Sequence, residues 1–197
     1  MTKRGVTLVE LILAMMITAL IGVGVASTLY AASYGTSSRR EVRRVAVRSQ
    51  QLQSRIEDAI RNARAILASG QVSAGYGYLV LWAGDTNQNN HVNLSELQLI
   101  ELPSGSATLS SYANPSPTTD TEYAPATDFY TAAQTAKTTD NLIGTPWAKG
   151  ISNFALTVNS SKPANKPLVT WSLKLTDQLL SENLVCAASL RSPGQAQ

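Results

Sequence analysis

A twelve-residue stretch of the sequence, Asp85 to Glu96, spaces oxygen-bearing residues in a pattern that could hold a metal ion. Side-chain oxygens stand at positions 1, 3, 5, 9 and 12 of this stretch, and position 7 offers a backbone carbonyl. Calcium takes about six to eight hard oxygen ligands on a curled backbone. The stretch therefore predicts a site for one Ca²⁺ whose ligands are Asp85, Asn87, Asn89, His91, Asn93 and Glu96.

The spacing resembles the EF-hand and dockerin-type calcium loop, with departures that lower the expected affinity. Asn90 occupies position 6, where that loop has Gly, and only Asp85 and Glu96 are charged. Asn tolerates left-handed backbone better than other residues with side chains, so the loop can still curl. The alternative is an Asn-rich connection between strands that binds nothing. His91 is the only histidine, which excludes a multi-histidine zinc site, and we expect its side chain to face solvent.

Glu10 is the second residue whose chemistry stands out, because it is the only charged residue between Val6 and Ala32. This almost continuously apolar run is long enough to span a bilayer, where a carboxylate is costly and indicates a functional partner. Cleavage between Gly5 and Val6 would create such a partner, the new α-amino group of a neighbouring copy. A buried charge pair of this kind sets register. The alternative is a carboxylate near the headgroups of a plain anchor.

The residues before the apolar run carry its orientation signal. Lys3 and Arg4 place positive charge in the leader 1–5, and positive flanks stay in the cytoplasm. We therefore expect a single-pass protein with a cytoplasmic N-terminus and a C-terminal domain outside. An ordinary secretory signal is cut after its apolar region, whereas a cut after Gly5 would retain the helix.

The start of the chain, Lys3-Arg4-Gly5-Val6-Thr7-Leu8-Val9-Glu10-Leu11, resembles the class III leader of type IV pilins and type II secretion pseudopilins. In that family a prepilin peptidase cuts after the Gly and methylates the new N-terminus. Here the first mature residue would be Val6, where the family usually has Phe. The resemblance covers about the first 30 residues. It implies processing at Gly5 and Val6, assembly through Glu10, and a bacterial inner membrane location before incorporation into a pilus or pseudopilus. The implied partners are the peptidase, other pilin or pseudopilin subunits and an assembly platform.

Helical periodicity continues after the apolar segment 6–32, over residues 33–69. Apolar and small residues recur at spacings of three and four, which predicts an amphipathic stalk helix that packs on a globular domain and stops near Gly70. The stripe comprises Val42, Val45, Ser49, Leu52, Ile56, Ala59, Ile60, Ala63 and Leu67. Eight arginines mostly occupy the other side. We interpret them as a solvated face with some pairing between subunits, and expect no nucleic acid because no aromatic residues are interleaved.

The residue pattern of 70–197 predicts a β-rich domain. Alternating or branched apolar residues predict five strands. These are Tyr76–Trp82, Leu97–Leu102, Phe154–Val158, Leu168–Leu175 and Leu184–Leu190. We expect a turn over Lys162–Pro167 and a loop-rich insertion over 103–148. The predicted fold is α+β and pilin-like, a long N-terminal helix packed on a small antiparallel sheet. The last strand resembles that of J-type minor pseudopilins.

Taken together, these features favour a structural minor pilin or pseudopilin subunit. The alternative is a membrane-tethered, calcium-dependent adhesin or adaptor. No nucleophile motif or phosphate-binding glycine loop is present, so we expect no enzymatic activity. The one cysteine, Cys186, lies in an apolar run and is expected to be a small core residue. Secretion and pilus functions both remain open.

Overall fold

The computed structural model describes residues 7–139, 141–159, 168–177 and 180–190, without the side chains of residues 35–39 and 177. The processing residues Gly5 and Val6 and the expected turn over 162–167 lie outside this range. The chain divides into two compact units, Met1–Arg44 and Val45–Gln197.

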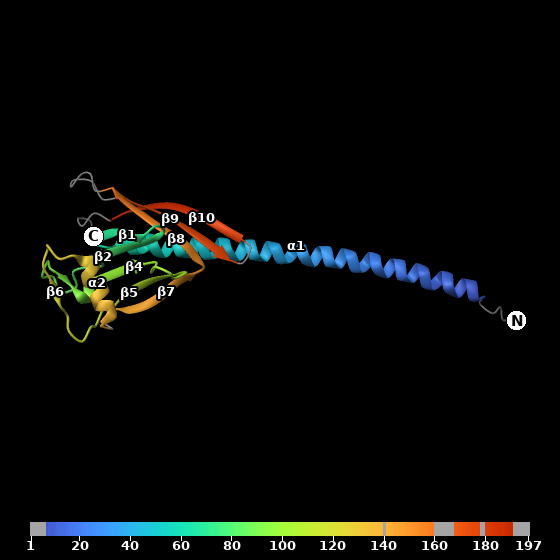
Figure 1. Cartoon of the computed structure of the whole chain (residues 1–197), viewed down its shortest axis with the longest axis horizontal. Helices are drawn as coiled ribbons and strands as arrows, with labels where there is room; N and C mark the ends of the chain where they lie inside the picture. Colours follow the sequence, from blue (N-terminus) through green and yellow to red (C-terminus); the bar gives the residue numbers. More distant parts are fainter. Residues whose placement is uncertain (1–6, 140, 160–167, 178–179, 191–197) are drawn as a thin grey trace. The chain divides into compact units, whose positions relative to one another are not determined.

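The first unit consists of the start of one long helix, α1 (Leu8–Asn62) (Figure 1). Its segment Leu8–Tyr34 has a mean hydropathy of 2.4 and is long and apolar enough to cross a membrane. Its large apolar side chains are exposed, which a lipid or protein environment would have to cover. The expected apolar helix at the N-terminus is thereby confirmed.

The second unit begins with the last turns of α1 and contains a mixed sheet of eight strands. Its order is β10-β9-β8-β2-β4-β5-β7, and β1 also pairs with β2 (Figure 1). Every pairing is antiparallel except the short parallel contact of β2 with β8. The strands are β1 (Ala65–Ser73), β2 (Tyr76–Trp82), β4 (Leu97–Glu101), β5 (Thr108–Ala113), β7 (Ile143–Lys149), β8 (Ile151–Asn159), β9 (Leu168–Asp177) and β10 (Leu180–Ser189).

Three smaller elements complete this unit. Strands β3 (Val92–Asn93) and β6 (Glu122–Tyr123) form a separate two-stranded sheet, and the short 3-10 turn η1 (Leu94–Glu96) follows β3. Helix α2 (Phe129–Thr138) is capped by Asp128, whose carboxylate accepts hydrogen bonds from two backbone N–H groups of the first turn. The α+β class predicted from the sequence is confirmed. The sheet, expected to be small and antiparallel, instead has eight strands and one parallel contact, between β2 and β8.

Two expectations about element boundaries were wrong. Helix α1 ends at Asn62, and residues 65–73, of which 65–69 were expected to be helical, form β1. This segment pairs along its length with β2, so sheet hydrogen bonding overrides a helical pattern of residues. The expected loop-rich insertion 103–148 contains β5, β6, α2 and β7. Its polar composition concealed β5, where Ser110 and Ser111 are buried and the amide of Gln98 donates to the Ser111 hydroxyl at 2.9 Å.

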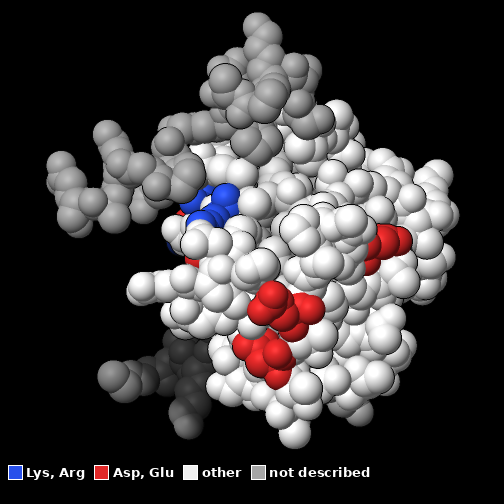
Figure 2. All heavy atoms as spheres, turned by 90° about the vertical axis from the view of Figure 1, so that its left-hand side faces the viewer, with Lys and Arg blue, Asp and Glu red and all other residues white. Residues whose placement is uncertain are grey.

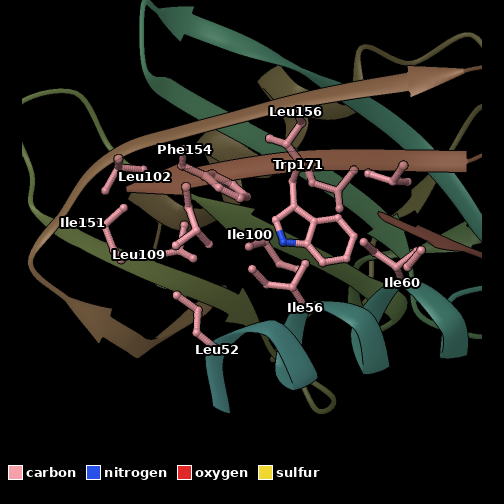
Figure 3. Packing of buried hydrophobic residues seen from close by; sticks show 14 of the residues in the cluster. Leu52, Ile56, Ile60, Ile100, Leu102, Leu109, Ile151, Phe154, Leu156 and Trp171 are labelled. Carbon is pink, nitrogen blue, oxygen red and sulfur yellow. The ribbon is translucent and has the colours of Figure 1, made fainter. Parts of the chain in front are cut away.

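The core of the second unit lies between α1 and one face of the sheet. Leu52, Ile56 and Ile60 are at most 2% exposed, and they pack in one cluster with Phe154 and Trp171 (Figure 3). Val45, Ser49 and Ala63 of the predicted stripe are buried as well. The stripe is therefore confirmed for the residues of α1 that belong to this unit.

A second cluster lies on the other face of the sheet. Along β2, Leu79 and Leu81 belong to the α1 cluster, whereas Val80 packs with Phe129 and Ala133 of α2. Alternate residues of a strand point to opposite faces, so this part of the sheet has a helix on each side.

Cys186 on β10 behaves as expected for a small apolar residue. It is half-buried and packs against the α1 cluster. Burial raises the pKa of its thiol, and the negative charge of Glu57 raises it further. The thiol therefore stays protonated at neutral pH, and the reactive thiolate is scarce.

Gly77 permits the close parallel approach of β2 and β8. A Cβ atom there would lie 2.5 Å from the backbone oxygen of Phe154 and 2.7 Å from a methyl carbon of Leu156. Because the first contact is with backbone, it cannot be relieved by a side-chain rotation. The junction between the two halves of the sheet depends on this glycine.

Replacing Gly77 with Ala should therefore lower the free energy of unfolding by about 1–3 kcal/mol, as overpacking does in other cores. The measurement is thermal unfolding of the full chain in detergent. Gly84→Ala is the matched control, since a Cβ there meets nothing within 4 Å. Equal melting temperatures for the two variants would contradict the packing argument.

Candidate functional sites

Glu10 lies at the start of α1 and is bonded to Thr7. The Thr7 backbone N–H and hydroxyl donate to Glu10 Oε2 at 2.9 and 3.0 Å, and the Glu10 N–H donates to the Thr7 hydroxyl at 3.3 Å. This reciprocal pattern is a capping box, which satisfies N–H groups that a helix leaves unpaired at its start. This capping role of Glu10 was not predicted from the sequence, although the spacing Thr-x-x-Glu is the sequence signature of a capping box.

The capping box gives Glu10 a local function that does not need a second copy. Its carboxylate is fully exposed in the single chain, so the same group remains accessible to a partner. Gly5 and Val6 lie outside the described residues, and the pairing of Glu10 with a freed amine stays a prediction. The two functions of Glu10, capping and charge pairing, can be separated by mutation because only the second needs a negative charge.

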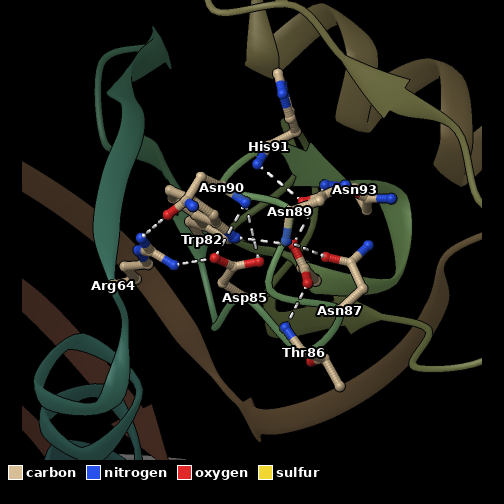
Figure 4. A network of polar contacts seen from close by, with 10 residues as sticks. Arg64, Trp82, Asp85, Thr86, Asn87, Asn89, Asn90, His91 and Asn93 are labelled. Atoms are coloured by element: carbon tan, nitrogen blue, oxygen red, sulfur yellow. Dashed lines mark hydrogen bonds and ion pairs between the residues drawn. The ribbon is translucent and has the colours of Figure 1, made fainter.

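The backbone of the Asp85–Glu96 loop turns at Asn90, as expected, and also at Gln88. Gln88 and Asn90 have φ values of 56° and 59°, so Asn90 adopts the left-handed conformation predicted for position 6. The Asn90 N–H points back to the Asp85 carboxylate, with its nitrogen 3.2 and 3.4 Å from the two oxygens (Figure 4). The side-chain oxygens of Asn87 and Asn89 accept from N–H groups two residues later, at 3.3 and 2.9 Å.

Glu96 closes the end of the loop and is only 2% exposed. Its Oε1 accepts from the Thr86 N–H at 2.5 Å, and its Oε2 accepts from the Trp82 indole at 2.9 Å and the Asn93 N–H at 3.4 Å. Position 8 of the loop, Val92, is buried and pairs with Tyr123 of β6. The bond from Thr86 holds the second and last positions of the loop near each other.

Arg64, just after α1, is the main competitor for an ion at this loop. Its guanidinium forms an ion pair with Asp85, donates to Asn90 Oδ1 at 2.7 Å, and lies 4.4 Å from the centre of the Trp82 ring (Figure 4). Among the described residues, no group of three or more His, Cys, Asp or Glu side chains could hold a metal ion. Calcium would depend on the Asn oxygens and would have to displace Arg64 from Asp85.

His91 turns its imidazole away from the loop (Figure 4). The side chain is half exposed, and Nδ1 lies 3.3 Å from a carboxylate oxygen of Glu122. The expected orientation toward solvent is confirmed. Only the backbone carbonyl of His91 is suited to be a ligand, as the loop pattern requires.

Comparisons with protein-family models, with curated proteins and with solved structures found no match for this chain.

Proposed function

We propose that this protein is a filament subunit of the type IV pilin or type II secretion pseudopilin kind. A prepilin peptidase cleaves it after Gly5, and the freed helix assembles in register with other subunits. The observation that carries the proposal is the single carboxylate, Glu10, at the start of an apolar segment that is long enough to span a membrane. A residue this costly in lipid indicates a partner.

The geometry of α1 supports this function in a second way. The apolar segment Leu8–Tyr34 and the stripe that anchors the sheet belong to one helix, α1. A subunit of this kind needs an apolar part for the membrane or filament interior and a folded part that remains in water. Buried charge pairs are better attested as devices for register than for stability, which suits a Glu10–Val6 pair between neighbours.

Glu10→Gln separates charge pairing from helix capping. Gln can occupy the same capping position but cannot neutralise a freed amine. We expect processing and membrane insertion to continue while incorporation into filaments falls on the order of tenfold, the effect of about 1.4 kcal/mol. Incorporation is measured by quantifying the chain in sheared filaments from its own host.

Thr7→Ala is the matched control, because it removes the hydroxyl of the capping box and keeps the charge of Glu10. This variant should lose about 1 kcal/mol of helix stability and still assemble. Normal assembly of Glu10→Gln together with a defect in Thr7→Ala would assign Glu10 to capping alone. Mass spectrometry should find a mature chain that starts at Val6. A chain that starts at Met1, or one trimmed beyond Ala32, would contradict the proposal.

A second candidate function is calcium binding at the Asp85–Glu96 loop, as in a membrane-tethered adhesin or adaptor. The observation that favours it is the left-handed backbone at Gln88 and Asn90, with the Asn90 N–H directed at Asp85. Asp85, Asn87, Asn89, Asn93 and Glu96 would supply side-chain oxygens and His91 its carbonyl. Bound calcium would neutralise both carboxylates and fix the loop against β6.

Calcium in excess should raise the melting temperature of the full chain in detergent by about 5 °C, since a ligand at 100 times its Kd contributes about 2.7 kcal/mol. Asp85→Ala should abolish the rise. Arg64→Gln should keep or enlarge it, because it removes the competing cation and leaves the ligands intact. Identical melting curves in calcium and in chelator, for both the wild type and Arg64→Gln, would exclude the site.

A further inference from the structure

A groove with a basic rim lies between α1 and the edge strand β7, within the second unit. It has a volume of about 320 Å³. Its lining includes Arg48, Leu52 and Arg55 from the helix and Pro146, Trp147 and Lys149 from the strand. A second hollow continues along α1 and shares Arg55 and Trp147 with the first.

The chemistry of the groove suits an acidic peptide that also carries apolar surface. Leu52 is buried and Trp147 is half-buried, whereas Arg48, Arg55 and Lys149 are exposed at the rim. Within the part of the chain that the structure describes, no carboxylate lines the first hollow. Guanidinium groups bind carboxylates through two parallel hydrogen bonds, and an indole face offers a large apolar contact.

The chain itself contains a segment of matching chemistry. From Ala65 to Ala136 it has six carboxylates and no Lys or Arg. Asp85, Glu96 and Glu101 are held inside by Arg64, Trp82 and Lys137. The other three carboxylates lie within nine residues of each other, in a stretch that is mostly exposed; they are Asp120, Glu122 and Asp128. The face that is on the left in Figure 1, where β6 lies, shows several acidic side chains and few basic ones (Figure 2).

The acidic segment Asp120–Asp128 is held in place for docking. Asp120 accepts from the Ser95 N–H and hydroxyl, both at 2.8 Å, and Glu122 is in β6. Hydrogen bonds from the Thr131 hydroxyl and N–H lower the pKa of Asp128, so its carboxylate is ionised at neutral pH. A segment fixed in this way loses little conformational entropy on binding.

The groove and the segment of one molecule are at different places along α1. The segment lies beside the Asp85–Glu96 loop, which Arg64 joins to the end of α1. Arg48 lies fourteen residues before the helix end at Asn62, about 21 Å along the axis. Two complementary surfaces at different positions on one chain produce a head-to-tail contact, which gives a ring or an open filament according to the rotation between copies.

We propose that the groove of one molecule binds the acidic segment Asp120–Asp128 of a second copy of this chain. The inference rests on the proposed filament function, which requires contacts that repeat. Arg55 and Lys149 face the carboxylates of Glu122 and its neighbours, and Trp147 covers the apolar residues between them. Salt should weaken the contact, since exposed charge pairs are screened.

Cysteine cross-linking of the full chain in membranes tests the contact. In a Cys186→Ala background, Gln51→Cys marks the groove and Thr121→Cys marks the segment. A chain with both cysteines should form a ladder of disulfide-linked multimers on oxidation. Two chains with one cysteine each, when mixed, should form dimers only. Absence of the ladder, or a disulfide-linked dimer from either single-cysteine chain alone, would overturn the proposal.

Charge reversal in the double-cysteine chain tests the chemistry. Arg55→Glu with Lys149→Glu should reduce the ladder on the order of fivefold, and adding Glu122→Arg should recover part of it. Lys174→Glu is the matched control, because Lys174 is an exposed cation of β9 outside the groove. An undiminished ladder in the charge-reversed chain would overturn the proposal, as would equal loss in the control.

These experiments distinguish failure of the groove contact from failure of the proposed filament function. A chain that is processed and enters filaments but forms no ladder would contradict the groove contact alone. A ladder from a chain that starts at Met1 would support the contact and contradict the processing. Binding of the groove to anionic vesicles with no ladder between copies would assign the basic rim to a lipid surface and overturn the proposal.

Discussion

The burial of three residues of α1 determines the arrangement of the second unit. Leu52, Ile56 and Ile60 are almost completely covered by the sheet, where they meet Phe154 and Trp171. Full burial of such side chains contributes about 1.5–3 kcal/mol each.

Because these three residues fix the last turns of α1, they also fix Arg64, two residues beyond the end of the helix. The Arg64 N–H donates to the Trp82 carbonyl at 2.7 Å, and its side chain reaches Asp85. The position of the candidate calcium loop therefore depends on a hydrophobic contact in the preceding turns of the helix.

The parts of the fold that could be predicted from the sequence are those with a local period. The stripe of α1 repeats every three or four residues, and the strands near the C-terminus alternate, because each element buries one face. The end of α1 was misjudged since Ala63 and Leu67 continue the helical spacing. The pairing of residues 65–73 with β2 is a tertiary effect that no local pattern records. Similarly, β5 is rich in Ser and Thr, and its burial depends on neighbours from β4 and β7.

The candidate sites also contain features that a local pattern predicts and features that only folding creates. The spacing of Asp85, Asn90 and Glu96 predicted a curled loop with a left-handed turn, since ligand pattern and turn geometry are both local. The competing Arg64 is 21 residues away from Asp85, and no pattern in the sequence joins the two. The basic groove has no sequence signal at all, because Arg55 and Lys149 belong to elements that only folding brings together.

Under the proposed filament function, the capping box at the start of α1 would act in a single copy that has not yet bound its neighbours. A lone copy in lipid would carry a carboxylate whose hydration has been removed, yet Thr7 already supplies donors to Glu10 Oε2. These donors are within three residues, so they travel with the helix and need no other molecule. On joining a filament, Glu10 Oε2 would exchange its Thr7 donors for the amine of a neighbouring copy. The carboxylate would therefore have hydrogen-bond donors both before and after assembly. Under the proposed function, such an exchange would let a single copy remain in lipid before assembly.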